Sequence, residues 1–189
     1  MTPVRDGQSR PARAFIDILP NDDARAAFRA WCAARVGAGL PKLRDFAPFN
    51  LPRRLVPWSL LYHLRADGEL VYGLAGEEMI YMFHGNPKGR RILDYAAPQE
   101  RAARVALLMQ VIRAGLPVWF VGALLFEDKA HVPIGRLCMP VATGEGDGIL
   151  LLYVALGPAP LPRLEPRMRT SFDERDVFWC TQADIDALT

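Results

Sequence analysis

Hydrophobic residues along the chain follow two different spacings. In the stretches 21–37 and 98–114 they recur every three or four residues, which predicts helices with one buried face. Elsewhere they form short runs with few polar interruptions, bounded by turn residues, and such runs predict strands. The runs cover residues 59–64, 69–74, 118–126, 132–141 and 149–156.

Residues at the ends of these stretches agree with the prediction. Asn21 can cap the first helix with its side chain. Pro98 suits the first turn of the second helix, and Gly115 suits its end. Asp67-Gly68 separates the first two strands, and this pair favours a tight hairpin turn.

The order of the elements indicates the fold class. A helix precedes two strands, short helical turns within 77–97 lead to the long helix, and three strands follow. This order predicts an α+β fold with a five-stranded antiparallel sheet, a helical cover on one face and an additional N-terminal helix. A concavity between the 79–114 crossover and the sheet would suit a small molecule.

A chain of 189 residues suits one domain with appended arms. Within the first arm, 14–19 is expected to be a short extended piece; in the tail, 176–188 is expected to form a docked helix anchored by Phe178 and Trp179. The expected divisions are an N-terminal arm (1–20), a helix with a proline-rich entry segment (21–58), a core (59–157) and a tail rich in proline and arginine (158–189).

Charge and hydrophobicity narrow the possible partners. The net charge of +2 is too small to indicate nucleic-acid binding. Residues 1–58 nevertheless hold ten basic and five acidic residues, an excess that favours a partner protein or a second copy of the chain. No apolar run approaches about 18 residues, and no secretory signal is evident, so we expect neither a membrane span nor export.

Residues that often carry chemistry are few and scattered. No two of them have metal-ligand spacing, and no serine lies in a nucleophile elbow. We therefore expect no metal site, no catalytic residues and no enzymatic activity. The odd number of separated cysteines fits a reducing compartment, here the cytoplasm. The histidines and cysteines are His63, His84, His131, Cys32, Cys138 and Cys180.

Several short motifs in the same order resemble a known family. From about residue 28 to 157 the chain resembles the PAS-like family of short proteins common in alphaproteobacteria. Gly73 departs from that pattern, because the family usually has arginine there. The matching motifs are Trp31, Gly39-Leu40-Pro41, Asp45, Pro48, Leu51-Pro52, Pro57, Tyr72-Gly73-Leu74-Ala75-Gly76, Gly85, Gly89-Arg90 and Met139-Pro140.

The resemblance implies a PAS fold and a role in sensing or regulation, without a defined ligand. A photoactive flavin domain needs a cysteine in an Asn-Cys-Arg-Phe-Leu type of helix, which is missing here. A haem-binding PAS domain usually takes its axial histidine from the long helix, and 98–114 contains none. Both cofactors are therefore disfavoured, and the cofactor stays unidentified.

The strand and helix patterns suggest which residues line a pocket. The alternative is that these residues fill an ordinary core. PAS domains often dimerise through an N-terminal helix, which makes Phe28 and Trp31 candidates for a dimer interface. The predicted ligand-binding residues are Tyr72, Met79, Phe83, His84, Trp119 and Tyr153.

Three functions remain open at this stage. The first is a stand-alone PAS-type sensory or regulatory module, without an attached output domain, that binds a small apolar molecule or a partner protein. The second is a structural dimerisation or interaction module with a filled core. The third is a small-molecule enzyme on a related fold. The volume and lining of the cavity beneath the helical cover would distinguish among them.

Overall fold

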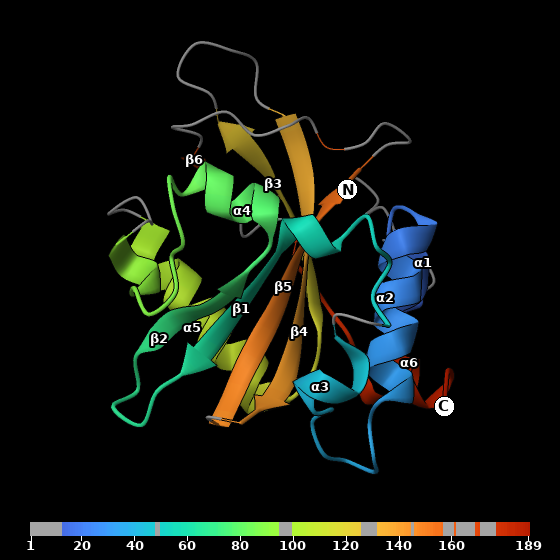
Figure 1. Ribbon diagram of the computed structural model, residues 1–189. Helices are drawn as coiled ribbons and strands as arrows, with labels where there is room; N and C mark the ends of the chain where they lie inside the picture. Colours follow the sequence, from blue (N-terminus) through green and yellow to red (C-terminus); the bar gives the residue numbers. More distant parts are fainter. Residues whose placement is uncertain are drawn as a thin grey trace, which may run out of the picture.

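An antiparallel sheet forms the centre of the molecule in this computed structural model (Figure 1). The structure describes residues 13–47, 50–94, 100–125, 132–144, 146–156, 161, 169–170 and 177–189. The long strands lie in the order β2-β1-β5-β4-β3. They are β1 (Ser59–Leu64), β2 (Leu70–Ala75), β3 (Val118–Leu125), β4 (Val132–Thr143) and β5 (Gly146–Ala155).

Two short strands extend the sheet beyond the expected five. β6 (Arg169–Thr170) and β7 (Val177–Trp179) both pair antiparallel with β3. The expectation of a docked helix over 176–188 was therefore wrong in its first part. Phe178 is exposed, while its neighbours in β7 are half-buried, which is the alternation of a strand. A short helix, α6 (Gln182–Asp186), follows β7.

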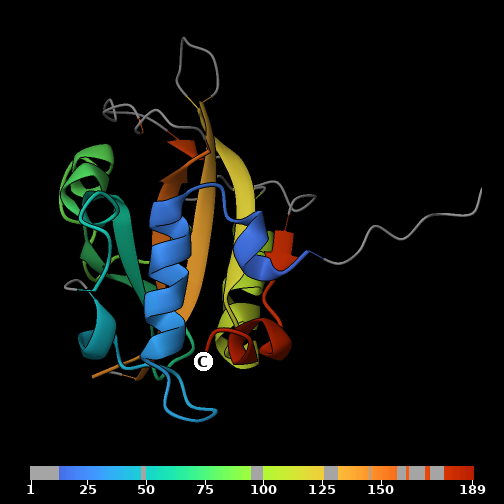
Figure 2. The same ribbon diagram turned by 90° about the vertical axis from the view of Figure 1, so that its right-hand side faces the viewer.

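Helices cover both faces of the sheet rather than one (Figures 1 and 2). The predicted crossover lies on one face, and the N-terminal helices lie on the other together with α6. The crossover contains α4 (Glu77–Met82), the 3-10 helix η2 (Ile92–Asp94) and α5 (Arg101–Ala114). The N-terminal elements are α1 (Phe15–Ile18), α2 (Asp22–Ala33), α3 (Leu43–Phe46) and the 3-10 helix η1 (Val56–Trp58).

The central strands are buried on both faces as a result. In β5, Leu150 and Leu152 pack in the cluster beneath α2, and the alternate residues Ile149, Leu151 and Tyr153 pack in the cluster beneath α5. This two-sided burial explains why the strands read as nearly continuous apolar runs instead of alternating ones.

The helix α2 begins where the sequence predicts. The Asn21 side chain accepts a hydrogen bond from the backbone N–H of Ala24 (2.9 Å) and donates one to the carbonyl of Ala155 (2.9 Å). Further along the helix, the buried indole of Trp31 donates to the carbonyl of Pro140 (2.7 Å). These contacts attach both ends of α2 to the sheet, and Figure 2 shows the helix lying along it.

The segment before α2 and the end of the described chain lie together. Residues 15–18 form a helical turn instead of the expected extended piece. The backbone N–H of Phe15 donates to the Asp184 carboxylate (2.8 Å). The same carboxylate completes a capping box at the start of α6 by accepting hydrogen bonds from the backbone N–H (2.8 Å) and hydroxyl (2.6 Å) of Thr181. Asp184 therefore joins α1 to α6.

We predict that Asp184→Ala lowers the free energy of unfolding by about 1–2 kcal/mol at neutral pH, because three donors lose a charged acceptor. Partial burial raises the pKa of Asp184, but the hydrogen bonds from Thr181 and Phe15 outweigh it and hold this pKa below its ordinary value of 3.8. The stabilisation is therefore complete above that value and is lost as the pH falls through the lower, folded-state pKa. Urea denaturation from about pH 6 to pH 3 measures it.

The matched control is Asp186→Ala on the same helix, whose exposed carboxylate accepts only from Gln182 among the hydrogen bonds recorded. It is expected to change stability by less than about 0.5 kcal/mol. A difference between Asp184→Ala and the unmodified chain that persists undiminished at the lowest pH would contradict the role given to the Asp184 carboxylate.

The strands β2 and β3, which flank the other three long strands, both have additional backbone partners. The backbone of Tyr72 in β2 accepts from Gly89 (2.7 Å) and donates to Arg90 (2.9 Å). At the opposite edge, β6 and β7 pair with the two ends of β3. The segment 85–90, whose glycines only superficially suggest a phosphate loop, thus forms a turn that packs against the edge of β2.

Candidate functional site

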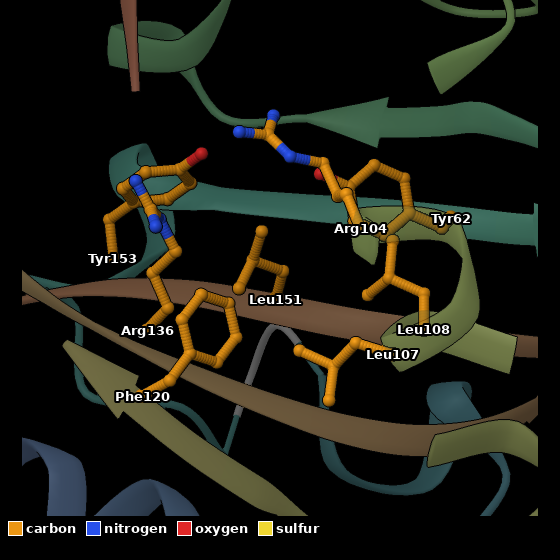
Figure 3. A pocket seen from close by; sticks show the side chains of 8 residues that line it. All are labelled: Tyr62, Arg104, Leu107, Leu108, Phe120, Arg136, Leu151 and Tyr153. Atoms are coloured by element: carbon orange, nitrogen blue, oxygen red, sulfur yellow. The ribbon is translucent and has the colours of Figure 1, made fainter. Parts of the chain in front are cut away.

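A small cavity lies between α5 and the sheet, at the place where the sequence predicts a pocket (Figure 3). Its volume is about 20 Å³, which suits about one water molecule. Within the part of the chain that the structure describes, none of the residues that line it is acidic. They are Tyr62, Arg104, Leu107, Leu108, Phe120, Arg136, Leu151 and Tyr153.

Arg136 is the buried charged residue of the described core, with 3% of its surface exposed. It lies on β4 directly between Phe120 of β3 and Tyr153 of β5 in the strand register. Its guanidinium carbon is 5.4 Å from the centroid of each of these two rings. The two aromatic faces thus stabilise the cation by cation–π contact.

Burial lowers the pKa of Arg136 from its ordinary value, and the neighbouring Tyr153 partly offsets this effect. The guanidinium nevertheless stays charged, because arginine does not lose its proton in proteins. The cavity therefore has a fixed positive charge in its wall.

Arg104 supplies a second cation from α5. Its guanidinium forms an ion pair with Glu100 one turn earlier on the chain (3.0 Å), and both side chains are mostly buried. Figure 3 shows Arg104 beside Tyr62, while Arg136 lies beside Tyr153. The Glu100 carboxylate therefore lies against the guanidinium of Arg104.

The hydroxyl group of Tyr62 completes the polar lining. Burial raises its pKa well above the ordinary value, and the nearby Tyr72 and Tyr153 raise it further. Tyr62 is therefore protonated at physiological pH and can donate a hydrogen bond. Two guanidinium groups and a phenol hydroxyl are donors that suit a negatively charged group.

Four of the six predicted ligand-binding residues lie on this face of the sheet. Tyr153 lines the cavity. Tyr72, Met79 and Phe83 instead pack together nearby, with the Tyr72 and Phe83 rings 5.2 Å apart. Tyr62 contacts this group through Tyr72, also at 5.2 Å between centroids. The three side chains therefore belong to the packed core that borders the cavity.

The other two predicted residues lie elsewhere. Trp119 is buried in the cluster beneath α2, on the opposite face, where its ring lies over the backbone of Gly135. His84 is exposed at the end of α4, in a left-handed conformation with a φ of 55°. Neither side chain is among those that line the cavity.

Phe28 and Trp31, the predicted dimer-interface residues, are fully buried in the chain's own core. Their rings pack with Phe15 and against the sheet. They present no surface to a second copy in this fold. The physical reason is that the apolar stripe of α2 packs against a sheet face that would otherwise be exposed. The stripe is therefore buried within the chain itself.

The most informative site residue, Arg136, was missed by the sequence interpretation. A signal was present, because Arg136 is a single charge inside the otherwise apolar run 132–141. A charge at such a position is rarely buried unless it has a specific environment. Arg104 carries no comparable signal, since α5 has several arginines.

The described residues give little support for a metal site or for a reactive cysteine. No group of three histidine, cysteine or acidic side chains there could hold a metal ion. Burial raises the pKa of Cys32 to about 11 and that of Cys138 to about 12, and it also raises the pKa of Cys180. These three thiols are free and buried, and they stay protonated at physiological pH.

Comparison with known proteins agrees with this geometry. A family model described as PAS domain matches residues 20–155. The chain belongs to the PAS domain family. The match begins at the residue before the α2 cap and ends with the last residue of β5, so it contains the whole long-stranded sheet and its crossover.

Membership of this family identifies the chain as a sensory or regulatory module in the general sense. No curated protein and no solved structure matches this PAS domain. Among the described residues, no helix has the length and apolar character needed to cross a membrane.

Proposed function

We propose that this PAS domain senses a small molecule carrying a negatively charged group, which binds between α5 and the sheet. The buried guanidinium of Arg136, held between two aromatic rings at the wall of the cavity, is the observation that carries the proposal. The sequence favoured an apolar ligand, whereas the lining favours an anionic group beside an apolar body. The leucines of the lining would contact that body.

The small volume gives this proposal a mechanical consequence. A cavity of about 20 Å³ cannot hold a metabolite, so a ligand must displace α5 as it enters. Such a displacement is a direct way to report binding, because α5 covers the sheet through only a few buried side chains, namely Leu108, Val111 and Ile112. The proposal involves no catalysis, and its proposed setting is the cytoplasm.

The small volume of the cavity beneath α5 also favours a second function, that of an interaction module with a filled core. Tyr72, Met79 and Phe83 pack closely, which is also what an interaction module with a filled core would show. In that case Arg136 would specify the packing of the core and would bind nothing. The experiment below distinguishes the two functions.

The test is a thermal-shift and calorimetric screen against small carboxylates and phosphate esters. A true ligand at about 100 times its dissociation constant stabilises the chain by about 2.7 kcal/mol, which raises Tm by about 5–10 °C. Arg136→Met keeps a long, unbranched side chain in the core but removes the guanidinium, so it is expected to abolish the shift; circular dichroism of the variant checks that it is folded.

Arg113→Met is the matched control, because it removes the same charge from an exposed position at the end of α5. It should leave the ligand-induced shift unchanged. If no anion stabilises the chain, or if Arg136→Met responds like the unmodified chain, the filled-core function replaces the sensing function.

A further inference from the structure

A second and larger hollow lies on the opposite face of the sheet, between the start of α3 and the strands β1 and β2. Its volume is about 560 Å³, within the range of pockets that bind ligands or peptide side chains. The helices α2 and α3 contact β4, and Figure 1 shows both of them away from β2. We call this hollow the basic groove.

The floor of the basic groove is shaped by Gly73. A Cβ atom at this position of β2 would overlap the ring of His63, so the imidazole lies directly over the β2 backbone. The His63 Nδ1 is 3.3 Å from the hydroxyl of Thr143, which itself donates to the carbonyl of Gly146 (2.9 Å). The His63 Nδ1–H therefore donates to Thr143, and this hydrogen bond holds the ring in place.

Cations surround this floor. Lys42, immediately before α3, and Arg44 of α3 line it, and Lys88 lines it from the turn after α4. Among the described residues, no acidic side chain lines it. Within the described chain, neither lysine has a carboxylate at ion-pair distance, and Arg44 has only the exposed Asp45 at 3.6 Å, a pair that contributes little in water.

An apolar side chain stands among these cations. Leu74 of β2 is 62% exposed, and the buried Leu61 also lines the groove. An apolar side chain among cations can contact an apolar residue of an acidic segment while the cations meet its carboxylates. The combination of cations and an apolar side chain therefore indicates what kind of molecule the groove would bind.

We propose that the basic groove docks an acidic segment of a partner protein, which places an apolar side chain on Leu74 and carboxylates beside Lys42, Arg44 and Lys88. Charge complementarity supports this choice of occupant, since the groove is lined by cations. The exposed Leu74 also favours a segment with an apolar side chain over a free inorganic anion, which has none. The docking surface does not depend on the ligand proposed beneath α5.

The strand β1 separates the two sites. Tyr62 points into the cavity beneath α5, and the next residue, His63, lies in the basic groove. This follows from the alternation of side chains along a strand. Loss of one site through a surface substitution should therefore leave the other intact, which allows the two proposals to fail separately.

The experiment uses the full chain and a fluorescent eight-residue peptide that has one central leucine flanked by glutamates. Fluorescence anisotropy at low salt should show binding. A peptide with glutamine in place of every glutamate, and one with serine in place of leucine, should each bind at least about tenfold more weakly. Raising the salt to about 0.5 M should also weaken binding of the acidic peptide.

The variants Lys42→Glu/Lys88→Glu and Leu74→Ser change exposed side chains and are expected to fold. Each should weaken binding of the acidic peptide by about tenfold or more. Arg113→Glu, which reverses a charge at the exposed end of α5, is the matched control and should bind as the unmodified chain does.

Amide chemical shifts locate the peptide independently of affinity. Shifts confined to the residues that line the groove, Gly73, Leu74 and Thr143 among them, support docking in the basic groove. Shifts in α5, equal loss of binding in Arg113→Glu, or equal binding of the glutamine peptide would overturn the proposal. Binding to vesicles of anionic lipid that needs Lys42 and Lys88, without binding of the peptide, would overturn it in favour of a membrane surface.

Discussion

Trp31→Ala is expected to lower the free energy of unfolding by about 3–5 kcal/mol, a large fraction of the stability of a domain of this size. The Trp31 ring is fully buried between α2 and the sheet, and its removal leaves a large cavity. The carbonyl of Pro140 also loses the indole N–H that donates to it. Urea denaturation followed by circular dichroism measures the change.

Two companion variants separate the contributions. Trp31→Phe keeps an aromatic ring but removes the donor to Pro140, and it is expected to cost about 1–3 kcal/mol. Val36→Ala, at a position that is 88% exposed, should change stability by less than about 0.5 kcal/mol. If Trp31→Ala left the monomer stable and changed only the association of two copies, Trp31 would be an interface residue, contrary to the structure.

Gly135→Val is expected to lower the free energy of unfolding by about 3 kcal/mol. Any Cβ atom at Gly135 would overlap the six-membered ring of Trp119, which is itself buried and cannot move without disturbing the core beneath α2. The measurement is again the midpoint and slope of urea denaturation, since an unchanged slope shows that only stability has changed.

Gly144→Val is the matched control, because a Cβ atom at Gly144 would meet no atom within 4 Å. It should be nearly neutral. Combining Gly135→Val with Trp119→Ala should cost less than the sum of the two single changes, because the smaller side chain makes room for the added one. Strict additivity of the two changes would contradict the contact between Trp119 and Gly135.

Local features of this fold could be predicted because they depend on neighbouring residues. Asn21 caps α2 as expected, and Asp67-Gly68 forms the β1–β2 turn with a φ of 83° at Gly68. The long helix was predicted over 98–114 and is observed at Arg101–Ala114. In each case a cap, a turn or a hydrophobic spacing is visible within a few residues of the element that it specifies.

The sequence does not show in the same way which side chains and helices lie on which face of the sheet. In β3, Trp119 and Phe120 are equally apolar, so the pattern does not tell which of them faces α5. The structure assigns Phe120 to that face and Trp119 to the other. For the same reason, the apolar stripe of α2 is compatible with both a dimer interface and the chain's own sheet.

The candidate site was predicted in location and only partly in composition. Tyr72, Met79, Phe83 and Tyr153 are on the predicted face, but whether aromatic side chains line a cavity or fill it depends on packing at the scale of a single atom. Arg136 would have been the better choice. A charge within an apolar strand has to be explained by its surroundings, whereas an aromatic residue in a core does not.

The backbone partners along β2 and β3 limit how copies of the chain can associate. β3 is paired at both ends with β6 and β7, and the middle of β2 is paired with the turn that contains Gly89 and Arg90. Joining two sheets into one continuous ribbon would require these segments to detach first. A homodimer that joined the two sheets directly at β2 or β3 would therefore have to displace one of these segments.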